Sequence, residues 1–309
     1  MIGFLLIGIL IIVSTCQSIL TRFYSTSYPG REDLCSPIFT VVSGFTLVLV
    51  TFCLAGFRFE ASQTTLILVL CNALALVLYN TSMLKASANG PYSVTVVFMI
   101  AGGIVIPAIV TAFFGDDLSW VKILAITVVL ISVYMISYKD GESYKNKKLF
   151  FLSCAGLAVG NGVYGSIIDA HFRLTTPTGL TTSPEGTELL IVTYFGAALI
   201  SAVMLFFKAR GDLPALKKQS KTSVIFLIAA SIIIAASVNL VVYTIGFVDT
   251  TILYTFDNSC VFLLSVLFSC LVFKERLTKL NAIGCVTLCL ALVCMSLSPQ
   301  IAAYVASLF

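Results

Sequence analysis

Ten apolar stretches, each close to the length of a membrane-spanning helix, fill most of this chain of 309 residues. A helix rises about 1.5 Å per residue and the hydrocarbon core of a bilayer is about 30 Å thick, so one crossing needs roughly 20 apolar residues. Because a backbone inside hydrocarbon must satisfy its own hydrogen bonds, these stretches favour helices over open strands. We predict helices over residues 2–20, 37–56, 64–83, 92–113, 119–137, 149–170, 188–207, 223–246, 250–273 and 280–297.

The composition agrees with a chain that lies in the bilayer. Apolar residues make up 59% of it and charged residues 10%, whereas a soluble domain carries about 25% charged residues. The polar connections are short, so we expect an all-α integral membrane protein without a soluble domain. Residues 2–13 resemble the apolar part of a signal peptide, but no basic region precedes them, and we interpret them as part of a retained first helix.

The basic residues predict the orientation of the chain. With the N-terminus outside, 15 of the 18 Lys and Arg residues lie in or beside the cytoplasmic connections, and only Arg58, Lys122 and Arg173 fall on the opposite side. The positive-inside rule therefore favours both termini outside, and we expect the protein in the cell (inner) membrane. Since topology accounts for the basic residues, no nucleic acid partner is expected.

Several kinds of chemistry have no sequence signal. The ten cysteines are scattered and form no C-x-x-C pair, so neither a zinc site nor a disulfide framework is indicated. No Walker-type phosphate-binding sequence is present, which argues against ATP hydrolysis. We therefore expect no cofactor and no enzymatic activity.

A charged segment at the middle of the chain divides it into two halves. Residues 139–148 form a linker between a first unit, 1–138, and a second unit, 149–309, and each unit contains five predicted spans. Because five is odd, the second unit must cross the membrane in the opposite sense, which is the geometry of an inverted repeat. The fold class that we expect is therefore ten transmembrane helices arranged as two inverted five-helix repeats.

The two halves also share a turn sequence. Phe114-Gly-Asp-Asp-Leu-Ser119 follows the fourth predicted helix and Phe273-Lys-Glu-Arg-Leu-Thr278 follows the ninth, at a spacing of 159 residues. The same spacing aligns Asn80 with Asn239. Ser119 and Thr278 are predicted N-caps of the helices that follow.

These features resemble the drug/metabolite transporter (DMT) superfamily, in its EamA-like branch. The usual turn of that family is Gly-Glu-Arg-Leu-Thr followed by a glycine in the next helix, which corresponds here to Glu275 and Gly284 with Lys274 in place of the first glycine. The first-half copy keeps Gly115 but has Ala125 in place of the later glycine. The resemblance implies two inverted repeats around a central cavity and transport by alternating access. It leaves the substrate open, because the branch includes exporters and importers of amino acids, metabolites and cations.

Asp257 is the main candidate for a binding residue. It lies within the ninth predicted span, in Tyr254-Thr-Phe-Asp-Asn-Ser259. An ionised carboxylate facing lipid costs several kcal/mol, so acids within spans usually face a cavity or a partner. We interpret Asp257 as a site for a proton or for a cationic group of the substrate. The alternative is a structural acid that pairs with a neighbouring helix. Its first-half counterpart, Phe98, is apolar.

Amides and tyrosines complete the candidate site. Amides can line a polar pocket, or they can simply hydrogen-bond between helices for about 0.6 kcal/mol each. Tyrosine rings can bind a cation for roughly 0.5 to 2 kcal/mol, or they can lie in the interfacial aromatic belt, which we expect for Tyr194. The candidates besides Asp257 are Asn258, Tyr254, Asn80, Asn239, Tyr164, Asn161 and Gln17.

Two further groups of residues are open to more than one interpretation. Gly102-Gly103 and Pro107 permit either a bend in the fourth helix or ordinary close packing. Asp169 and Arg173 are spaced for an i,i+4 ion pair, and we expect His171 between them to be solvated at the interface.

The sequence therefore predicts a secondary active transporter that moves a small polar or cationic solute across the lipid bilayer by alternating access, with protons as a candidate coupling ion. One alternative is a passive facilitator, whose flux would ignore a pH gradient. Another is a membrane-embedded lipid-handling enzyme, for which only Asp169 and His171 come near a catalytic pair.

Overall fold

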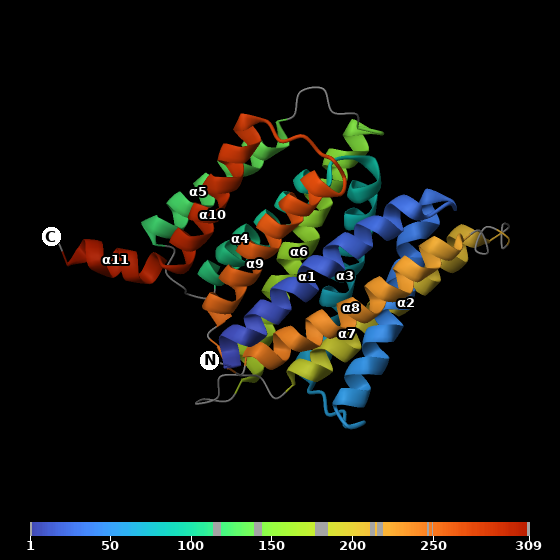
Figure 1. Cartoon of the computed structure of the whole chain (residues 1–309). Helices are drawn as coiled ribbons and strands as arrows, with labels where there is room; N and C mark the ends of the chain where they lie inside the picture. The colour runs from blue at the N-terminus through green and yellow to red at the C-terminus, as the bar shows by residue number, and fades with distance from the viewer. Residues whose placement is uncertain are drawn as a thin grey trace.

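The computed structural model describes residues 2–113, 119–138, 144–176, 185–210, 214, 219–245, 247–248 and 250–307. Over these residues its elements are all helices (Figure 1). The helices are α1 (Ile2–Ser27), α2 (Glu32–Leu54), α3 (Gln63–Asn89), α4 (Tyr92–Phe113), α5 (Trp120–Ser137), α6 (Lys147–Thr175), α7 (Gly186–Ala209), α8 (Lys221–Ile245), α9 (Thr250–Leu271), α10 (Lys279–Ser296) and α11 (Ser298–Ala306).

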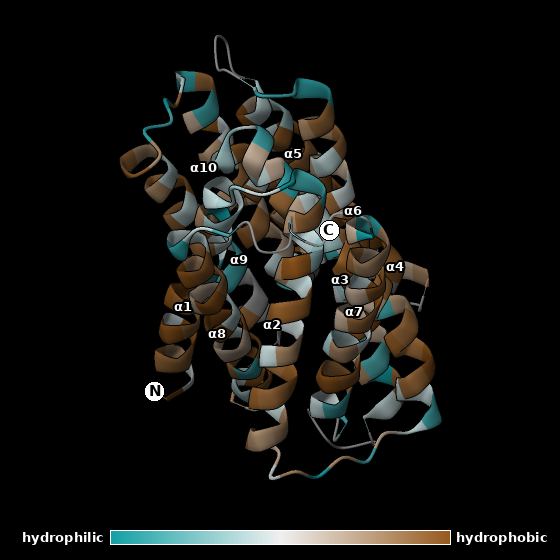
Figure 2. Ribbon diagram, turned by 90° about the vertical axis from the view of Figure 1, so that its right-hand side faces the viewer, coloured by the Kyte–Doolittle hydropathy of each residue, from teal (hydrophilic) through white to brown (hydrophobic). Residues whose placement is uncertain are grey.

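The chain is an all-α integral membrane protein. Among the described residues, nine helices are long and apolar enough to cross a bilayer, and α9 has a shorter apolar part, Phe256–Leu271. Figure 2 shows hydrophobic residues along the middle of the helices and hydrophilic residues gathered toward their two ends. The short helix α11 was not predicted, and it turns away from the axis of α10 (Figure 1).

Most predicted helix limits are close to the observed ones, and the first helix differs most. It was expected to end at residue 20, but α1 continues to Ser27. Its last turns bury Thr21, Tyr24 and Ser25, so they pack within the protein. Arg22, which the charge pattern assigned to a connection, therefore lies in the helix and is only partly exposed.

Hydrogen bonds between connections show which of them lie at the same end of the bundle. The Lys145 N–H donates to the Asn89 carbonyl at 3.1 Å, and the Asn89 amide donates to Glu32 at 2.8 Å. These bonds join the connections at which α1, α3 and α5 finish, and we name this end the basic end. At the opposite end the Ser62 N–H donates to the Glu185 carboxylate at 3.0 Å, which joins the connection after α2 to the one after α6.

The helices pack mainly across the two halves of the chain. Helix α3 packs against α6 and α7, and α8 packs against α1 and α2. Helix α4 contacts α6 and α9, while α1 contacts α9. Two further pairs, α2 with α7 and α5 with α10, each combine one helix from either half (Figure 1).

Small residues bring the backbone of α6 close to two neighbours. A Cβ atom at Gly102 of α4 would lie 2.1 Å from the carbonyl oxygen of Ala158, and one at Gly162 would lie 2.5 Å from the carbonyl oxygen of Gly102. On another side of α6, a Cβ atom at Gly160 would lie 2.7 Å from the Tyr79 nitrogen of α3. Gly102 thus serves close packing between helices, as small residues commonly do in membranes.

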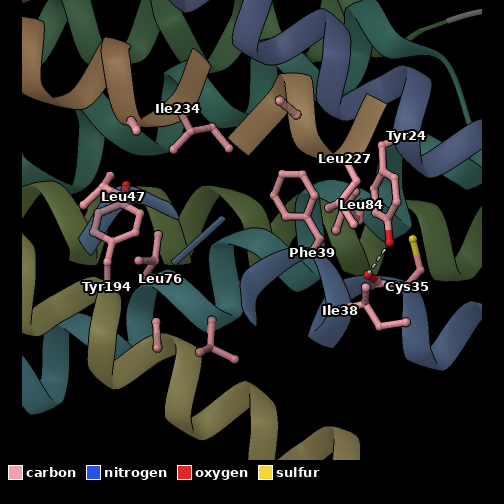
Figure 3. Close-up of a cluster of buried hydrophobic side chains, with 14 of the residues drawn as sticks. Tyr24, Cys35, Ile38, Phe39, Leu47, Leu76, Leu84, Tyr194, Leu227 and Ile234 are labelled. Atoms are coloured by element: carbon pink, nitrogen blue, oxygen red, sulfur yellow. Dashed lines mark hydrogen bonds between the residues drawn. The ribbon is translucent and has the colours of Figure 1, made fainter. Parts of the chain in front are cut away.

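A buried cluster joins α1 and α2 to α3, α7 and α8. Its largest members include Tyr24, Phe39 and Tyr194, and Figure 3 shows them with the aliphatic side chains around them. The Tyr24 ring lies 5.5 Å from the Phe39 ring, centroid to centroid, and its hydroxyl donates to the Cys35 carbonyl at 3.3 Å. The hydroxyl of this buried tyrosine thus has a partner within the protein.

Polar side chains of the second half complete helix ends of the first half. The buried Asn281 side chain of α10 donates to the carbonyls of Met135, Ile136 and Tyr138, at 2.9, 3.0 and 2.9 Å, where α5 ends. Terminal carbonyls of a helix have no partner within the helix. The predicted N-caps are confirmed, because Ser119 accepts from the Lys122 N–H at 3.3 Å and Thr278 accepts from the Asn281 N–H at 3.2 Å.

We expect Gly102→Ala to lower the free energy of unfolding by about 1–3 kcal/mol, which is typical of overpacking. The added methyl group would collide with backbone atoms of Ala158, which cannot rotate away. Thermal unfolding in detergent measures the effect. The matched control is Gly8→Ala, since Gly8 has no atom within 4 Å of the added carbon. Equal melting temperatures for the two variants would contradict close packing of α4 on α6.

Candidate functional site

The Asp257 carboxyl group lies among α1, α8 and α9. Its Oδ1 atom is buried and has no hydrogen-bond partner among the residues that the structure describes. The Ser14 side chain of α1 is a polar neighbour of the carboxyl group, and the Ser14 Oγ atom is 3.1 Å from the Ser237 Oγ atom of α8. The side chain therefore points into the protein rather than into the acyl chains.

The Oδ1 atom of Asp257 can therefore still accept a hydrogen bond or bind a cation. A buried acceptor without a donor costs about 1–3 kcal/mol, and more when it is charged. The polar neighbours of Asp257 are Ser14 and Cys260, and among the described residues it forms no ion pair with a cationic side chain. A proton or a cationic group bound at Oδ1 would remove the deficit, and the hydroxyls of Ser14 and Ser237 lie where they can orient it.

Three further candidate residues, Gln17, Asn258 and Tyr254, lie on α1 and α9, the helices that carry Ser14 and Asp257. Gln17 is one turn beyond Ser14 on α1, and Asn258 follows Asp257 on α9; both are partly buried. Residues three apart on a helix share a face, so Gln17 is a neighbour of Ser14. The side chain of Tyr254 lies outside the described residues.

Two of the candidate amides connect helices. The Asn239 amide donates to Thr51 Oγ1 of α2 and to the Ala235 carbonyl, both at 2.8 Å. The Asn161 amide of α6 donates to the Met99 carbonyl of α4 at 2.8 Å. Each NH₂ group is thus engaged in bonding between helices, the alternative that we stated for these residues.

Asn80 differs from these two amides. Its side chain is 7% exposed, and among the described residues no hydrogen bond to it is found. Neither of its polar atoms is fully covered by protein. An amide in this state retains two donors and an acceptor for a ligand or for water.

Three tyrosines from α3, α6 and α7 form a group. Tyr164 is a neighbour of both Tyr79 and Tyr194, and the Tyr79 hydroxyl donates to the Met99 sulfur at 3.3 Å. Tyr194 is 6% exposed, so its expected place in the interfacial belt is wrong. Tyr79 and Tyr164 retain some accessible surface.

A second polar group, at the basic end, was not predicted. The Glu275 carboxylate accepts from the N–H of Tyr92 at 2.5 Å, from the N–H of Ser93 at 3.2 Å and from the Ser93 hydroxyl at 2.7 Å. It thus caps the N-terminus of α4, where backbone donors are free and negative charge is favoured. Glu275 belongs to the turn sequence that the two halves share, so the sequence drew attention to this residue. The sequence did not show that its carboxylate contacts the start of α4.

Arg22 lies in the same region. Its Nη1 atom donates to the carbonyl of Gly90 at 2.8 Å and to that of Ser87, at the end of α3. The guanidinium carbon is 5.8 Å from the centroid of the Tyr92 ring and 5.2 Å from that of Phe273. Cation–π contacts of this kind contribute about 0.5–2 kcal/mol.

At the opposite end, a chain of hydrogen bonds begins at His171. The His171 Nε2 atom is 2.9 Å from the Thr65 hydroxyl, which also bonds to the Glu185 carboxylate. His171 has no exposed surface, so the expectation that it is solvated is wrong. The start of α3 covers the ring and supplies its partner. Beside this chain is an open pocket of about 580 Å³, whose lining includes Arg58, Glu185 and Glu188.

The predicted ion pair between Asp169 and Arg173 is confirmed. The Arg173 Nε atom donates to the Asp169 carboxylate at 2.8 Å, and both side chains are about 40% exposed, at 38% and 42%. Asp169 and His171 therefore bond to different neighbours, and the described contacts do not join them in a catalytic pair.

Comparisons with known proteins inform the fold alone. No protein-family model and no curated protein matches the sequence. A solved structure titled only "Crystal structure of protein" is similar over 96% of this chain and 98% of its own, with a TM-score of 0.59 and 13% sequence identity. The helical arrangement is thus shared with a protein of similar length.

The Thr65 and Ser62 hydrogen bonds hold the pKa of Glu185 below its usual range. A lowered folded-state pKa adds stability above the ordinary glutamate pKa of about 4.3, and this contribution is lost as the pH falls through the folded value. We expect Glu185→Gln to be less stable than the wild type at pH 7, with the difference shrinking below about pH 4.5.

Melting temperatures between pH 7 and pH 3.5 measure this difference. Glu60→Gln is the control, because Glu60 is exposed and lines the same pocket. A gap between Glu185→Gln and the wild type that stays constant over this range would contradict a stabilising carboxylate.

Proposed function

We propose that this protein is a secondary active transporter of the drug/metabolite transporter type, EamA-like branch, which moves a small polar or cationic solute by alternating access. The observation that carries this proposal is the buried Oδ1 atom of Asp257, which has no partner among the described residues and lies near Ser14, itself in contact with Ser237. Such a group within a membrane-embedded bundle is expensive to maintain, and ionisable groups in that position commonly serve transport.

The packing of the helices supports two inverted repeats with ten crossings, α9 being the ninth. If the two halves are repeats, α1 corresponds to α6, α2 to α7, and so on to α5 and α10. The contacts of α3 with α6 and α7 then correspond to the contacts of α8 with α1 and α2, and both sets are observed. The contact of α4 with α6 likewise corresponds to that of α9 with α1. The pairs α2 with α7, α4 with α9 and α5 with α10 correspond to themselves. This supports a first unit of α1–α5 and a second unit of α6–α10, as expected for 1–138 and 149–309, although Lys147 and Lys148 of the expected linker 139–148 belong to α6.

Both termini are proposed to face outward, with the basic end in the cytoplasm. The start of α1 lies beside the connection after α8, because a Cβ atom at Gly3 would lie 2.4 Å from Val248. The N-terminus is therefore at the end opposite the basic end. The positive-inside rule places the basic end in the cytoplasm of the cell (inner) membrane.

In this mechanism Asp257 exchanges a proton or a cationic substrate group between the two sides. The carboxylate binds the cation while one end is open, and it releases the cation after the bundle has rocked to open the other end. Ser14 and Ser237 orient the carboxyl group. Asn258, Gln17 and Tyr164 are proposed to contact the uncharged parts of the solute because they are only partly buried, and Asn80 is proposed to do so because it is 7% exposed and its polar atoms are not fully covered.

The orientation is tested with reporter fusions in a bacterium that has two membranes. Alkaline phosphatase fused after Phe309 should be active, because its disulfides form only outside the cytoplasm, whereas green fluorescent protein at the same place should be dark. An insertion in the linker after Gly141 should give the reverse pattern. Phosphatase activity from the linker fusion would invert the topology.

The role of Asp257 is tested by Asp257→Asn in proteoliposomes. A thermal-shift screen of amines, amino acids, sugars and nucleotides first identifies a solute, since a ligand of the folded state raises its stability. Uptake of that solute should fall about tenfold or more, because a bond to a charged group contributes about 1.5–3 kcal/mol and 1.4 kcal/mol is tenfold.

The control is Asp169→Asn, which removes a carboxylate from a partly exposed ion pair and should leave uptake unchanged. Undiminished uptake by correctly inserted Asp257→Asn would remove the proposed role. Wild-type uptake that does not respond to an imposed pH gradient would point to a passive facilitator or to uncoupled binding of the substrate cation.

A further inference from the structure

We propose that Arg22 is a gate residue, whose guanidinium group holds the basic end closed and must leave its partners for that end to open. The inference rests on the proposed alternating access. It concerns residues far along the chain from Asp257, and it is tested below without a solute.

The first observation is how Arg22 is held. Its Nη1 atom donates to two carbonyls at the end of α3, those of Ser87 and Gly90. Carbonyls at a helix C-terminus carry partial negative charge, so they favour a cation. The Nε atom is buried and has no hydrogen-bond partner among the described residues. This unsatisfied donor lowers the cost of releasing Arg22 from the two carbonyls.

The second observation is the number of segments that meet at this side chain. The guanidinium group lies over Tyr92 of α4 and over Phe273 of the connection after α9. The neighbouring Phe23 stacks on Phe226 of α8, with centroids 5.1 Å apart, and lies 5.4 Å from Phe273. Residues 22 and 23 thus link α1 with helix ends from both halves of the chain.

The third observation is the carboxylate of Glu275. It accepts two N–H groups at the start of α4, and it also interacts electrostatically with Arg22. The same acid therefore holds the connection after α9 to α4 and favours the charged guanidinium beside it. Separation of the two halves at this end would break both interactions together.

The fourth observation is a related position at the opposite end. Arg22-Phe23 lies near the C-terminal end of α1, and His171-Phe172 lies near the C-terminal end of α6, the corresponding helix of the proposed second repeat. His171 also bonds away from its own helix, to Thr65 of α3. One basic side chain near the end of α1 and one near the end of α6 thus fasten opposite ends of the bundle, as alternating gates require.

The test measures access of oxidant to Met83, which is 2% exposed and packs in one cluster with Tyr92 beneath the guanidinium group. We expect Arg22→Gln in nanodiscs to raise the rate of Met83 sulfoxide formation by hydrogen peroxide about fivefold or more, as the closed end opens locally. Glu275→Gln should act in the same direction.

The controls separate a gate from a structural anchor. Arg173→Gln removes an arginine of the exposed ion pair and should leave Met83 protected. Arg22→Lys keeps the charge but loses the planar group, so it should give an intermediate rate and serves if Arg22→Gln fails to fold. An unchanged Met83 rate in these Arg22 variants, or a parallel rise at Met135 and Met204, would overturn the gate. The rates need no transported solute, so failure of the flux assay and failure of the gate are distinguishable.

Discussion

Close backbone contact along α6 is the interaction on which the rest of this bundle depends. Lipid tails are as apolar as leucine, so hydrophobicity alone does not drive helices together inside a membrane. Gly160 and Gly162 let α6 approach α3 and α4 to distances at which a single added carbon would collide with backbone atoms. The hydrogen bond from Asn161 to the Met99 carbonyl forms across the same contact. The polar groups on α3, α4 and α6 keep their positions because of this packing.

The sequence predicted the helices well and their lateral contacts poorly. Apolar length is a local property, so the spans and the caps at Ser119 and Thr278 could be predicted from neighbouring residues. The burial of Arg22 and His171 could not, because it depends on Ser87, Gly90 and Thr65, which are remote in the chain. Charged side chains near predicted helix ends are usually exposed to solvent. Only the tertiary packing shows that Arg22 and His171 are covered.

The residues of the candidate site also differ in how well the sequence alone identifies them. Asp257 could be singled out because a carboxyl group in an apolar segment is costly wherever its side chain points. The amides gave no such signal, since Asn80 and Asn239 look equivalent in the sequence. In the structure Asn239 is bonded to Thr51, whereas among the described residues Asn80 has no partner. Only the neighbours of each amide distinguish an amide that can bind a ligand from one that joins two helices.

The helix ends of the first half have a consequence for biogenesis. Glu185 binds the start of α3, Glu275 binds the start of α4, and Asn281 binds the end of α5. All three residues leave the ribosome after the helices that they complete, because chains are made from the N-terminus. The early helices are therefore made before the side chains that complete their ends, and an arrested nascent chain would leave those ends accessible to membrane chaperones.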